Sequence, residues 1–331
     1  MKKIFKFKLL IVLAIILTLT LTSCVTDGEN VSNIDKGELE VHYIDIGQGD
    51  SIFIQLPNGE TILIDGGPRT NSKILVNYLE ELGVENINYL VATHPHEDHI
   101  GGLPNVIRNF KVDKIYMPDK TANTAIFEEF LLEIKEKDVE VNTVSGGDVL
   151  IEGDGLKYEV MAPNEEKYSN TNDYSIVTKI TYKNNSFLFT GDAEKTSEKE
   201  IIEKGYKLSS DVLKVGHHGS STSTSEDFLK NVQPKYGVIS CEKGNEYGHP
   251  HKEIIKILEN YGVEILRTDE LGTIVMTSDG KEIKIEDYED ANIEIENDKE
   301  GSFIGNKNTK VYHYHNCNYL PNKENQVVFN T

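Results

Sequence analysis

The chain has 331 residues, which is enough for one large hydrophobic core or two modest ones. It carries 55 acidic against 34 basic residues, and its formal net charge is −21 at pH 7. Tight non-specific binding of nucleic acid needs Lys and Arg to neutralise phosphates, so this charge argues against a stable, high-affinity nucleic-acid complex. Three cysteines are too few for a framework of disulfides.

The first 23 residues are typical of a secretory signal. Four lysines precede an uncharged apolar run at residues 9–21, which is too short to span a membrane comfortably. The run ends in Leu21-Thr22-Ser23-Cys24, which resembles a bacterial lipobox and implies a lipid on Cys24, with the chain anchored on the extracytoplasmic face of the cell membrane. A cleaved signal without lipid is the alternative.

Loss of this signal would remove four lysines and no acidic residue, taking the formal charge from −21 to −25. Residues 24–37 are polar and predict a tether between the lipid and a folded domain. We expect the lipid to be the chain's only contact with the membrane.

Apolar runs broken by Gly, Pro and Asn follow the tether. They predict strands at 39–46, 51–56 and 61–64, a helix at 72–82 and a strand at 87–93. Further along we expect a helix after Asp98, a strand at 114–117, a helix at 125–137, and strands near 141 and 149 and at 158–161, 176–190, 212–215 and 236–240. Meanders mixed with strand–helix units favour two sheets covered by outer helices over a single doubly wound sheet.

Three imidazoles and a carboxylate lie within six residues after the strand at 87–93. His94 and His96, two apart in extended chain, can project to one side and bind one cation. Asp98 and His99 can serve a second cation beside it. A polar loop with chance histidines is the alternative, but the whole chain has only 10 histidines, so three in one short loop favour a metal site.

The pattern His-x-His-x-Asp-His after a strand resembles the signature of the metallo-β-lactamase superfamily, whose α/β fold is a four-layered αββα sandwich. Other motifs resemble those of ComEC-type (competence-protein-like) hydrolase domains, in order and spacing over residues 38–287. They are Ile44-Asp45-Ile46-Gly47-Gln48-Gly49-Asp50, Leu63-Ile64-Asp65-Gly66-Gly67, Ile100-Gly101-Gly102, Thr190-Gly191-Asp192 and Lys214-Val215-Gly216-His217-His218-Gly219-Ser220.

The resemblance implies two divalent metal ions. The ligands would be His94 and His96 at the first ion, Asp98, His99 and His217 at the second, and Asp192 at both. Asp65 would orient a ligating histidine. His218 and His249 would be catalytic residues that act on the substrate, and Asp98 would be catalytic as well as a metal ligand. Three alternatives stay open: Asp192 as a helix cap, His218 as the ligand in place of His217, and His249 as a solvated loop residue.

The chain departs from the superfamily at one position. No histidine occurs between His99 and His217, so the third imidazole that other members use at the first metal is absent. The segment Asn172-Asp173-Tyr174-Ser175 occupies its place, and either Asp173 or no side chain would replace the imidazole. A weaker oxygen ligand shifts the preference from zinc toward manganese, so both metals remain candidates.

A two-metal site of this kind predicts hydrolysis by a metal-bound hydroxide. The resemblance implies phosphodiester substrates, since ComEC-type relatives are associated with DNA processing and related surface enzymes with phosphocholine or teichoic-acid esters. A carboxylic ester or lactone hydrolase on the same metals is the first alternative. A non-catalytic surface-binding lipoprotein is the second.

The sequence changes character after residue 287. Residues 288–300 are acidic and predict a linker. Residues 301–331 resemble a small Cys-rich module appended to secreted hydrolases and nucleases, but the usual Cys-x-x-Cys pair is missing. With only His313, His315 and Cys317, this appendage has too few ligands for a closed structural zinc site.

Overall fold

The computed structural model describes residues 37–286, 303–306, 312–314 and 326–329. Contacts divide the chain into two units, Met1–Glu286 and Asp287–Thr331. In the described parts of the chain, no helix has the length and apolar character needed to cross a membrane. The predicted signal, the lipidation site at Cys24 and the acidic linker lie outside the described residues, as do His315 and Cys317, and the proposed domain limits stay predictions.

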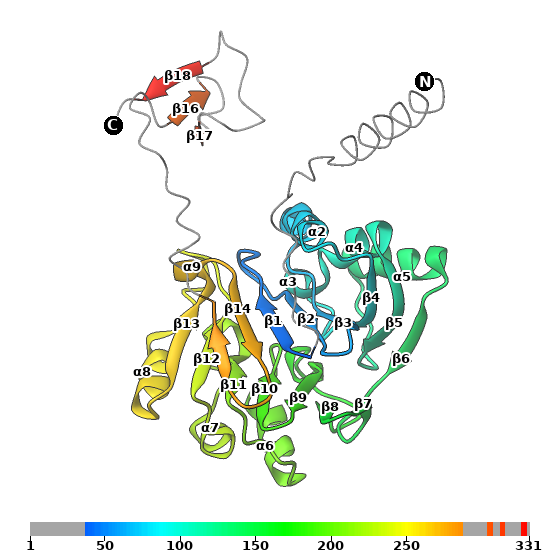
Figure 1. Ribbon diagram of the computed structural model, residues 1–331, viewed down its shortest axis with the longest axis vertical. Helices are drawn as coiled ribbons and strands as arrows, with labels where there is room; N and C mark the ends of the chain where they lie inside the picture. The colour runs from blue at the N-terminus through cyan, green and yellow to red at the C-terminus, as the bar shows by residue number, and fades with distance from the viewer. Residues whose placement is uncertain (1–36, 287–302, 307–311, 315–325, 330–331) are drawn as a thin grey trace, which may run out of the picture. The chain divides into compact units, whose positions relative to one another are not determined.

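Two large sheets form the first unit (Figure 1). The eight-stranded sheet has the order β15-β14-β1-β2-β3-β4-β5-β6 and the seven-stranded sheet the order β13-β12-β11-β10-β9-β8-β7. The strands of the first sheet are β1 (Leu39–Tyr43), β2 (Ile52–Gln55), β3 (Thr61–Ile64), β4 (Asn86–Val91), β5 (Lys111–Met117), β6 (Glu140–Thr143), β14 (Ile274–Ser278) and β15 (Ile283–Ile285). Those of the second are β7 (Val149–Gly153), β8 (Leu156–Ala162), β9 (Val177–Tyr182), β10 (Asn185–Phe189), β11 (Val212–Lys214), β12 (Tyr236–Ile239) and β13 (Glu264–Arg267).

Helices cover the outer face of each sheet (Figure 1). The α-helices are α2 (Ser72–Glu81), α3 (Glu97–Ile100), α4 (Leu103–Asn109), α5 (Ala125–Lys137), α6 (Lys195–Glu203), α7 (Glu226–Val232), α8 (Lys252–Asn260) and α9 (Thr268–Leu271), with 3-10 turns at Arg69–Asn71, Asn172–Tyr174 and Gly216–Gly219. Helices α2, α4 and α5 pack on the first sheet, and α6, α7 and α8 pack on the second. The order of layers is therefore helix, sheet, sheet, helix.

Local sequence explains where helix α5, the longest helix among the described residues, begins and ends. Helix α5 begins at a cap in which the Thr124 side chain accepts a hydrogen bond from the Phe127 backbone N–H, at 3.3 Å. It ends at Asp138, whose φ of 54° is left-handed, a common way to stop a helix. One face of α5 is apolar, and Phe127, Phe130 and Ile134 are buried against the sheet.

The core between the sheets consists of apolar side chains from both inner faces. The rings of Tyr43 in β1 and Phe189 in β10 lie 6.2 Å apart between centroids, and both residues are at most 1% exposed. Burying a large apolar side chain of this kind stabilises the fold by roughly 1.5–3 kcal/mol. This packing fixes one sheet against the other and with them the strand ends that carry the polar motifs.

The structure confirms the α/β four-layered fold. The segment predicted as strand at 176–190 forms two strands. A turn at Lys183, whose φ is 53°, folds it into the hairpin of β9 and β10. Strands β14 and β15 were not assigned from sequence, although β14 pairs antiparallel with β1 and closes the first sheet.

The second unit contains a small three-stranded sheet with the order β17-β16-β18. Its strands are β16 (Phe303–Asn306), β17 (Tyr312–Tyr314) and β18 (Gln326–Phe329), and β16 pairs antiparallel with both neighbours. His313 therefore lies in a strand.

Candidate metal centre

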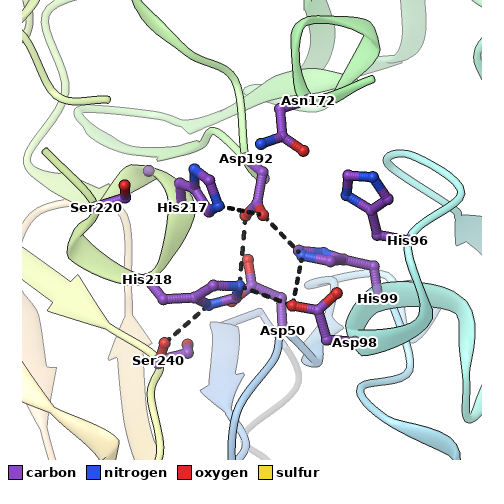
Figure 2. Close-up of polar contacts among 12 residues, drawn as sticks. Asp50, His96, Asp98, His99, Asn172, Asp192, His217, His218, Ser220 and Ser240 are labelled. Carbon is purple, nitrogen blue, oxygen red and sulfur yellow. Dashed lines mark hydrogen bonds and ion pairs between the residues drawn. The ribbon is translucent and has the colours of Figure 1, made fainter. Parts of the chain in front are cut away.

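The polar motifs meet at one edge of the two sheets. Asp65 follows β3, the His94–His99 loop follows β4, Asp192 follows β10, and the His217–His218 pair follows β11. These strands belong to the parallel parts of their sheets, so their carboxyl ends point the same way. Open α/β sheets bind ligands at such ends, and Figure 2 shows side chains from both sheets facing a common centre.

His94 and His96 form the first part of the site. His94 Nε2 lies 2.9 Å from His96 Nδ1, so the two ring nitrogens converge on one point. The Thr93 hydroxyl donates to Asp65 at 2.6 Å, which leaves its oxygen free to accept from His94 Nδ1 at 3.1 Å. That hydrogen bond places the His94 proton on Nδ1 and keeps the lone pair of Nε2 for a cation.

A second group combines two carboxylates with two imidazoles. One ligand atom from each of Asp98, His99, Asp192 and His218 lies within 4.8 Å of the others. His99 Nε2 is 3.2 Å from Asp192 Oδ2, while His218 Nε2 is 3.6 Å from Asp192 Oδ1 and 3.4 Å from Asp98 Oδ2. His94 Nε2 lies 3.8 Å from Asp192 Oδ2, so this carboxylate stands between the two groups (Figure 2).

His99 is oriented by Asp65, a fully buried carboxylate. Asp65 Oδ1 accepts the Thr93 backbone N–H at 2.8 Å, and Oδ2 accepts His99 Nδ1 at 2.8 Å. Because Nδ1 carries the proton, Nε2 turns its lone pair into the site. This is the geometry that the sequence predicted for Asp65.

His218 is held by two partners from different sheets. Its Nδ1 lies 3.0 Å from the Ser240 carbonyl oxygen, which has no proton to donate, so Nδ1 is the donor and Nε2 is free for a cation. Asp50 Oδ1 is 3.3 Å from the same Nδ1 and 2.8 Å from Lys214 Nζ. Lys214 and Asp50 are at most 1% exposed, which makes them a buried ion pair.

Sequence reasoning missed this ion pair, because Asp50 and Lys214 entered it only as members of two separate motifs. A signal was present: Lys214 is a charged residue in an apolar strand, and a buried lysine requires a partner. The loop before Asp50 must also approach the metal loop closely. A Cβ on Gly49, whose φ is 143°, would lie 2.2 Å from the Asp98 carbonyl oxygen, so only glycine fits there.

His217 and His218 both adopt left-handed backbone conformations, with φ of 50° and 54°. Left-handed geometry costs a non-glycine residue roughly 1–2 kcal/mol, and such strain clusters at functional sites. The turn buries His218 inside the ligand group and leaves the His217 side chain 21% exposed, with Nε2 3.5 Å from Asp192 Oδ2. The geometry therefore favours His218 over His217 as a ligand of the second metal ion. The sequence predicted His217 in this role, with His218 as the alternative.

Asp173 does not face the metal group. Its carboxylate accepts the Ser197 backbone N–H at 3.4 Å, near the start of α6. The neighbouring Asn172 lines the site instead. His249 is half-buried beside the ring of His217, at 5.5 Å between centroids, and its Nδ1 is buried. The structure thus brings His249 into the site and turns Asp173 away from it.

Burial and neighbouring charges give the imidazoles different proton affinities. Burial, together with the charge on His99, lowers the pKa of His94 well below its usual range. Burial also opposes the charged form of His218, but Asp192 and Asp50 outweigh it and raise the His218 pKa to about 10. Burial alone would raise the pKa of Asp192, yet His99 and His218 hold it well below its usual range.

These groups line a cavity of about 340 Å³. Its walls are formed by Gln48, His96, Glu97, Asp98, Asn172, Asp192, His217, His218, Tyr247 and His249. Tyr247 is 59% exposed at the surface and stacks on His249, with ring centroids 5.7 Å apart. Among the described residues that form these walls there is no Ser, Thr or Cys, so the cavity presents no aliphatic hydroxyl or thiol for nucleophilic attack.

Unpartnered buried atoms test whether this donor set suits metal ions. His99 Nε2, His218 Nε2 and Asp192 Oδ1 are buried and lack a hydrogen-bond partner. Buried polar atoms without partners are costly, and these three are the atoms that converge in the second group. Imidazole and carboxylate ligands around a shared aspartate suit two borderline or hard divalent cations, so the residues fit the metals that the sequence predicted.

Comparison with known proteins gives one family. The model of the metallo-beta-lactamase superfamily matches residues 44–243. The chain is 35% identical over 256 residues to ComE operon protein 3 of Bacillus subtilis (strain 168), covering 72% of this chain and 33% of that protein. It is 30% identical over 242 residues to competence protein ComA of Neisseria gonorrhoeae, covering 73% of this chain and 32% of that protein. The chain thus spans about a third of the length of these relatives.

Comparison with solved structures gives a similarity at low sequence identity. The metallo-beta-lactamase fold protein YhfI from Bacillus subtilis is 14% identical, with a TM-score of 0.48 over 73% of this chain and 100% of that one.

Proposed function

Because the chain belongs to the metallo-beta-lactamase superfamily, we propose that it is a metal-dependent hydrolase of phosphodiester bonds. The observation that carries this proposal is the convergence of Asp98, His99, Asp192 and His218, with their unpartnered buried atoms, next to the paired nitrogens of His94 and His96. Asp192 would contact both cations, because its Oδ2 lies 3.8 Å from His94 Nε2 in the first group and 3.2 Å from His99 Nε2 in the second.

The roles of the residues follow from their positions. When bound, two divalent ions lower the pKa of a water molecule and stabilise negative charge on the attacking and leaving oxygens. Asp65 and the Asp50–Lys214 pair hold the imidazoles in place. His217 and His249 stand at the cavity wall, where an N–H from either ring can donate to an anionic substrate oxygen.

Several features support a phosphodiester over other substrates. The cavity walls described above carry no Ser, Thr or Cys, so attack by water fits them better than a covalent route through one of these residues. The relatives are named for competence, and a third is called recombination protein 2, of Haemophilus influenzae. These names and the ComEC-type motifs favour phosphodiesters of nucleic acid or of the cell surface. The chain's charge of −21 makes transient contact with nucleic acid a better expectation than a stable complex.

We also propose that the protein is exported and anchored through a lipid on Cys24. The lysine-rich start, the apolar run and the sequence before Cys24 support this. Labelling cells with a radioactive fatty acid tests it: the wild-type chain should take up label and the Cys24→Ala variant should not. Equal labelling of both would exclude a lipid at this residue.

The hydrolase proposal is tested on three nitrophenyl compounds. The chain from residue 25 onward is stripped with a chelator, reloaded with manganese or zinc, and assayed with bis-p-nitrophenyl phosphate, p-nitrophenyl phosphate and p-nitrophenyl acetate. We expect metal-dependent release of nitrophenol mainly from the diester. Asp98→Asn should lower kcat/KM for the diester by about 10²-fold or more, since metal-ion stabilisation is worth several kcal/mol.

The matched control is Asp119→Asn, which makes the same chemical change on an exposed carboxylate and should leave the rate unchanged. Metal-dependent release from the acetate alone would replace the phosphodiester by a carboxylic ester. No release from any compound by a metal-loaded chain would contradict the hydrolase proposal and favour a binding protein.

A further inference from the structure

Asn172 carries a buried oxygen with no partner at the edge of the metal centre. The residue is 6% exposed and lines the cavity, and its Oδ1 has no hydrogen-bond donor. Figure 2 shows the amide above Asp192, with its oxygen on the side of His96. A buried acceptor left unpaired is unfavourable, so this oxygen calls for a cation or a donor that enters the cavity.

The orientation of the amide is fixed by Glu194. Asn172 Nδ2 lies 3.1 Å from Glu194 Oε1, and only the amide nitrogen can donate to a carboxylate. A flipped amide would place Oδ1 against this carboxylate and lose the hydrogen bond. The backbone is held as well, because Asn172 N–H donates to Asn170 Oδ1 at 3.1 Å and the Asn172 carbonyl accepts Ser175 N–H at 2.9 Å. The contact with Glu194 and the two backbone hydrogen bonds therefore hold the Asn172 side-chain oxygen toward the cavity.

The other side chains near this position are already engaged or belong to the second group. Asp173 is turned to α6. His217 Nδ1 lies 3.2 Å from Thr222 Oγ1 and 3.5 Å from Glu194 Oε1, on the far side of Asp192 from His96 (Figure 2). Asn172 thus offers a buried, unused oxygen on the side of His96.

We propose that Asn172 Oδ1 is a ligand of the first metal ion, completing a set with His94 Nε2, His96 Nδ1 and Asp192. This inference rests on the two-metal site of the proposed function and extends it to the identity of the metal. The set contains two imidazole nitrogens and two oxygens, where a third imidazole would make the site more nitrogen-rich. Amide and carboxylate oxygens suit manganese, whereas imidazole suits zinc, so the first position favours manganese more than a three-histidine site does.

The test measures metal binding rather than turnover. The full chain in mild detergent is stripped of metal and titrated with manganese and with zinc in competition with a fluorescent chelator. The wild-type chain should bind two ions of each metal. Asn172→Ala should weaken one of the two manganese sites by on the order of 10- to 100-fold and leave the other unchanged.

Asn172→His keeps a ligand at this position but replaces oxygen by nitrogen. It should restore two tight sites and shift the weaker one toward zinc by about tenfold or more. The matched control is Asn123→Ala, at an exposed asparagine before α5 that does not line the metal cavity, which should change neither affinity.

The outcomes separate this inference from the proposed function. Two ions bound with unchanged affinities in Asn172→Ala would overturn the role of Asn172 and leave the two-metal site intact. An equal loss at both sites would also overturn it, since a ligand of one ion should not weaken both alike. A wild-type chain that binds fewer than two ions would contradict the two-metal site itself, and with it this ligand.

Discussion

The two halves of the metal centre differ in how firmly their ligands are held. In the second half, made of Asp98, His99 and His218, each imidazole has a buried partner: Asp65 for one, and Ser240 with the Asp50–Lys214 pair for the other. In the first half, made of His94, His96 and Asn172, His94 is held by Thr93 and Asn172 by Glu194, but the His96 ring is exposed. Pre-oriented ligands bind more tightly, so we expect the second half to fill first and the first half to decide metal preference.

The largest effect should come from breaking the ion pair under the second half. Lys214→Met leaves the buried Asp50 with His218 as its remaining cationic neighbour, and removing one partner of a buried ion pair costs up to about 3–5 kcal/mol. Chemical denaturation of the metal-stripped chain should show this loss of unfolding free energy. Lys230→Met, which removes an exposed partner of Asp227, should change the unfolding free energy much less, because solvent screens exposed ion pairs. Equal losses of unfolding free energy in the two variants would mean that the buried Asp50–Lys214 pair contributes no more to stability than an exposed ion pair.

Next in size is the contrast between two adjacent histidines. His218→Ala removes a buried ligand and should abolish tight binding of one ion, with a fall of about 10²-fold or more in diester hydrolysis. His217→Ala removes a partly exposed ring and should leave two bound ions, with a rate loss of about tenfold. The count of bound metal separates the two. If His217→Ala lost the ion instead, the assignment would be reversed.

A smaller effect is expected at the partner of His99. Asp65→Asn places an amide where a carboxylate accepts the Nδ1 proton, so it disturbs the ring's tautomer and should weaken the second ion by roughly 10- to 100-fold. Asp211→Asn is the control, because Asp211 also accepts a backbone N–H, from Ser186, but away from the metal centre. Unchanged metal affinity in Asp65→Asn would show that metal binding by His99 does not depend on the Asp65 carboxylate.

The smallest effect concerns pH. The His218 pKa is raised to about 10, and Asp192, Asp98 and Asp65 raise that of His99 against the effect of burial. Both rings are protonated near neutral pH before a metal binds, so metal uptake must release protons and the apparent affinity should rise with pH, by up to about tenfold per unit for each proton released. Calorimetry in two buffers of different ionisation enthalpy measures the release. Affinity that does not change between pH 6.5 and 9 would contradict it.

The same shift sets the stability of the metal-free chain. Because the folded-state pKa of His218 lies above its unfolded value, the stabilisation from its protonation is fully present below about pH 6.5 and is lost as the pH rises through about 10.

Sequence was sufficient where chemistry is concentrated in one segment. The cluster from His94 to His99 and the strand ends before Asp65 and Asp192 lie at the places that the alternation of strands and turns predicted. These residues meet because parallel strands deliver them to the same sheet edge. The alternation of strands and helices favoured two sheets covered by helices, and the resemblance to the metallo-β-lactamase superfamily supplied the four-layered arrangement.

Sequence was insufficient where a single turn decides which side chain points inward. At Gly216–Gly219, two left-handed residues rotate His218 into the site, and neither conformation is visible in the residue types. In the 3-10 turn at Asn172–Tyr174, successive side chains point in different directions, so Asn172 faces the cavity and Asp173 faces α6. The pairing of Asp50 with Lys214 joins two sheets over a long stretch of chain, which no local pattern records.

The most direct test of the two-metal centre is a crystal structure of the manganese-loaded chain with anomalous diffraction. We predict two peaks on either side of the Asp192 carboxylate, one contacted by His94, His96 and Asn172 and the other by Asp98, His99 and His218. A single peak, or two peaks away from Asp192, would contradict the account.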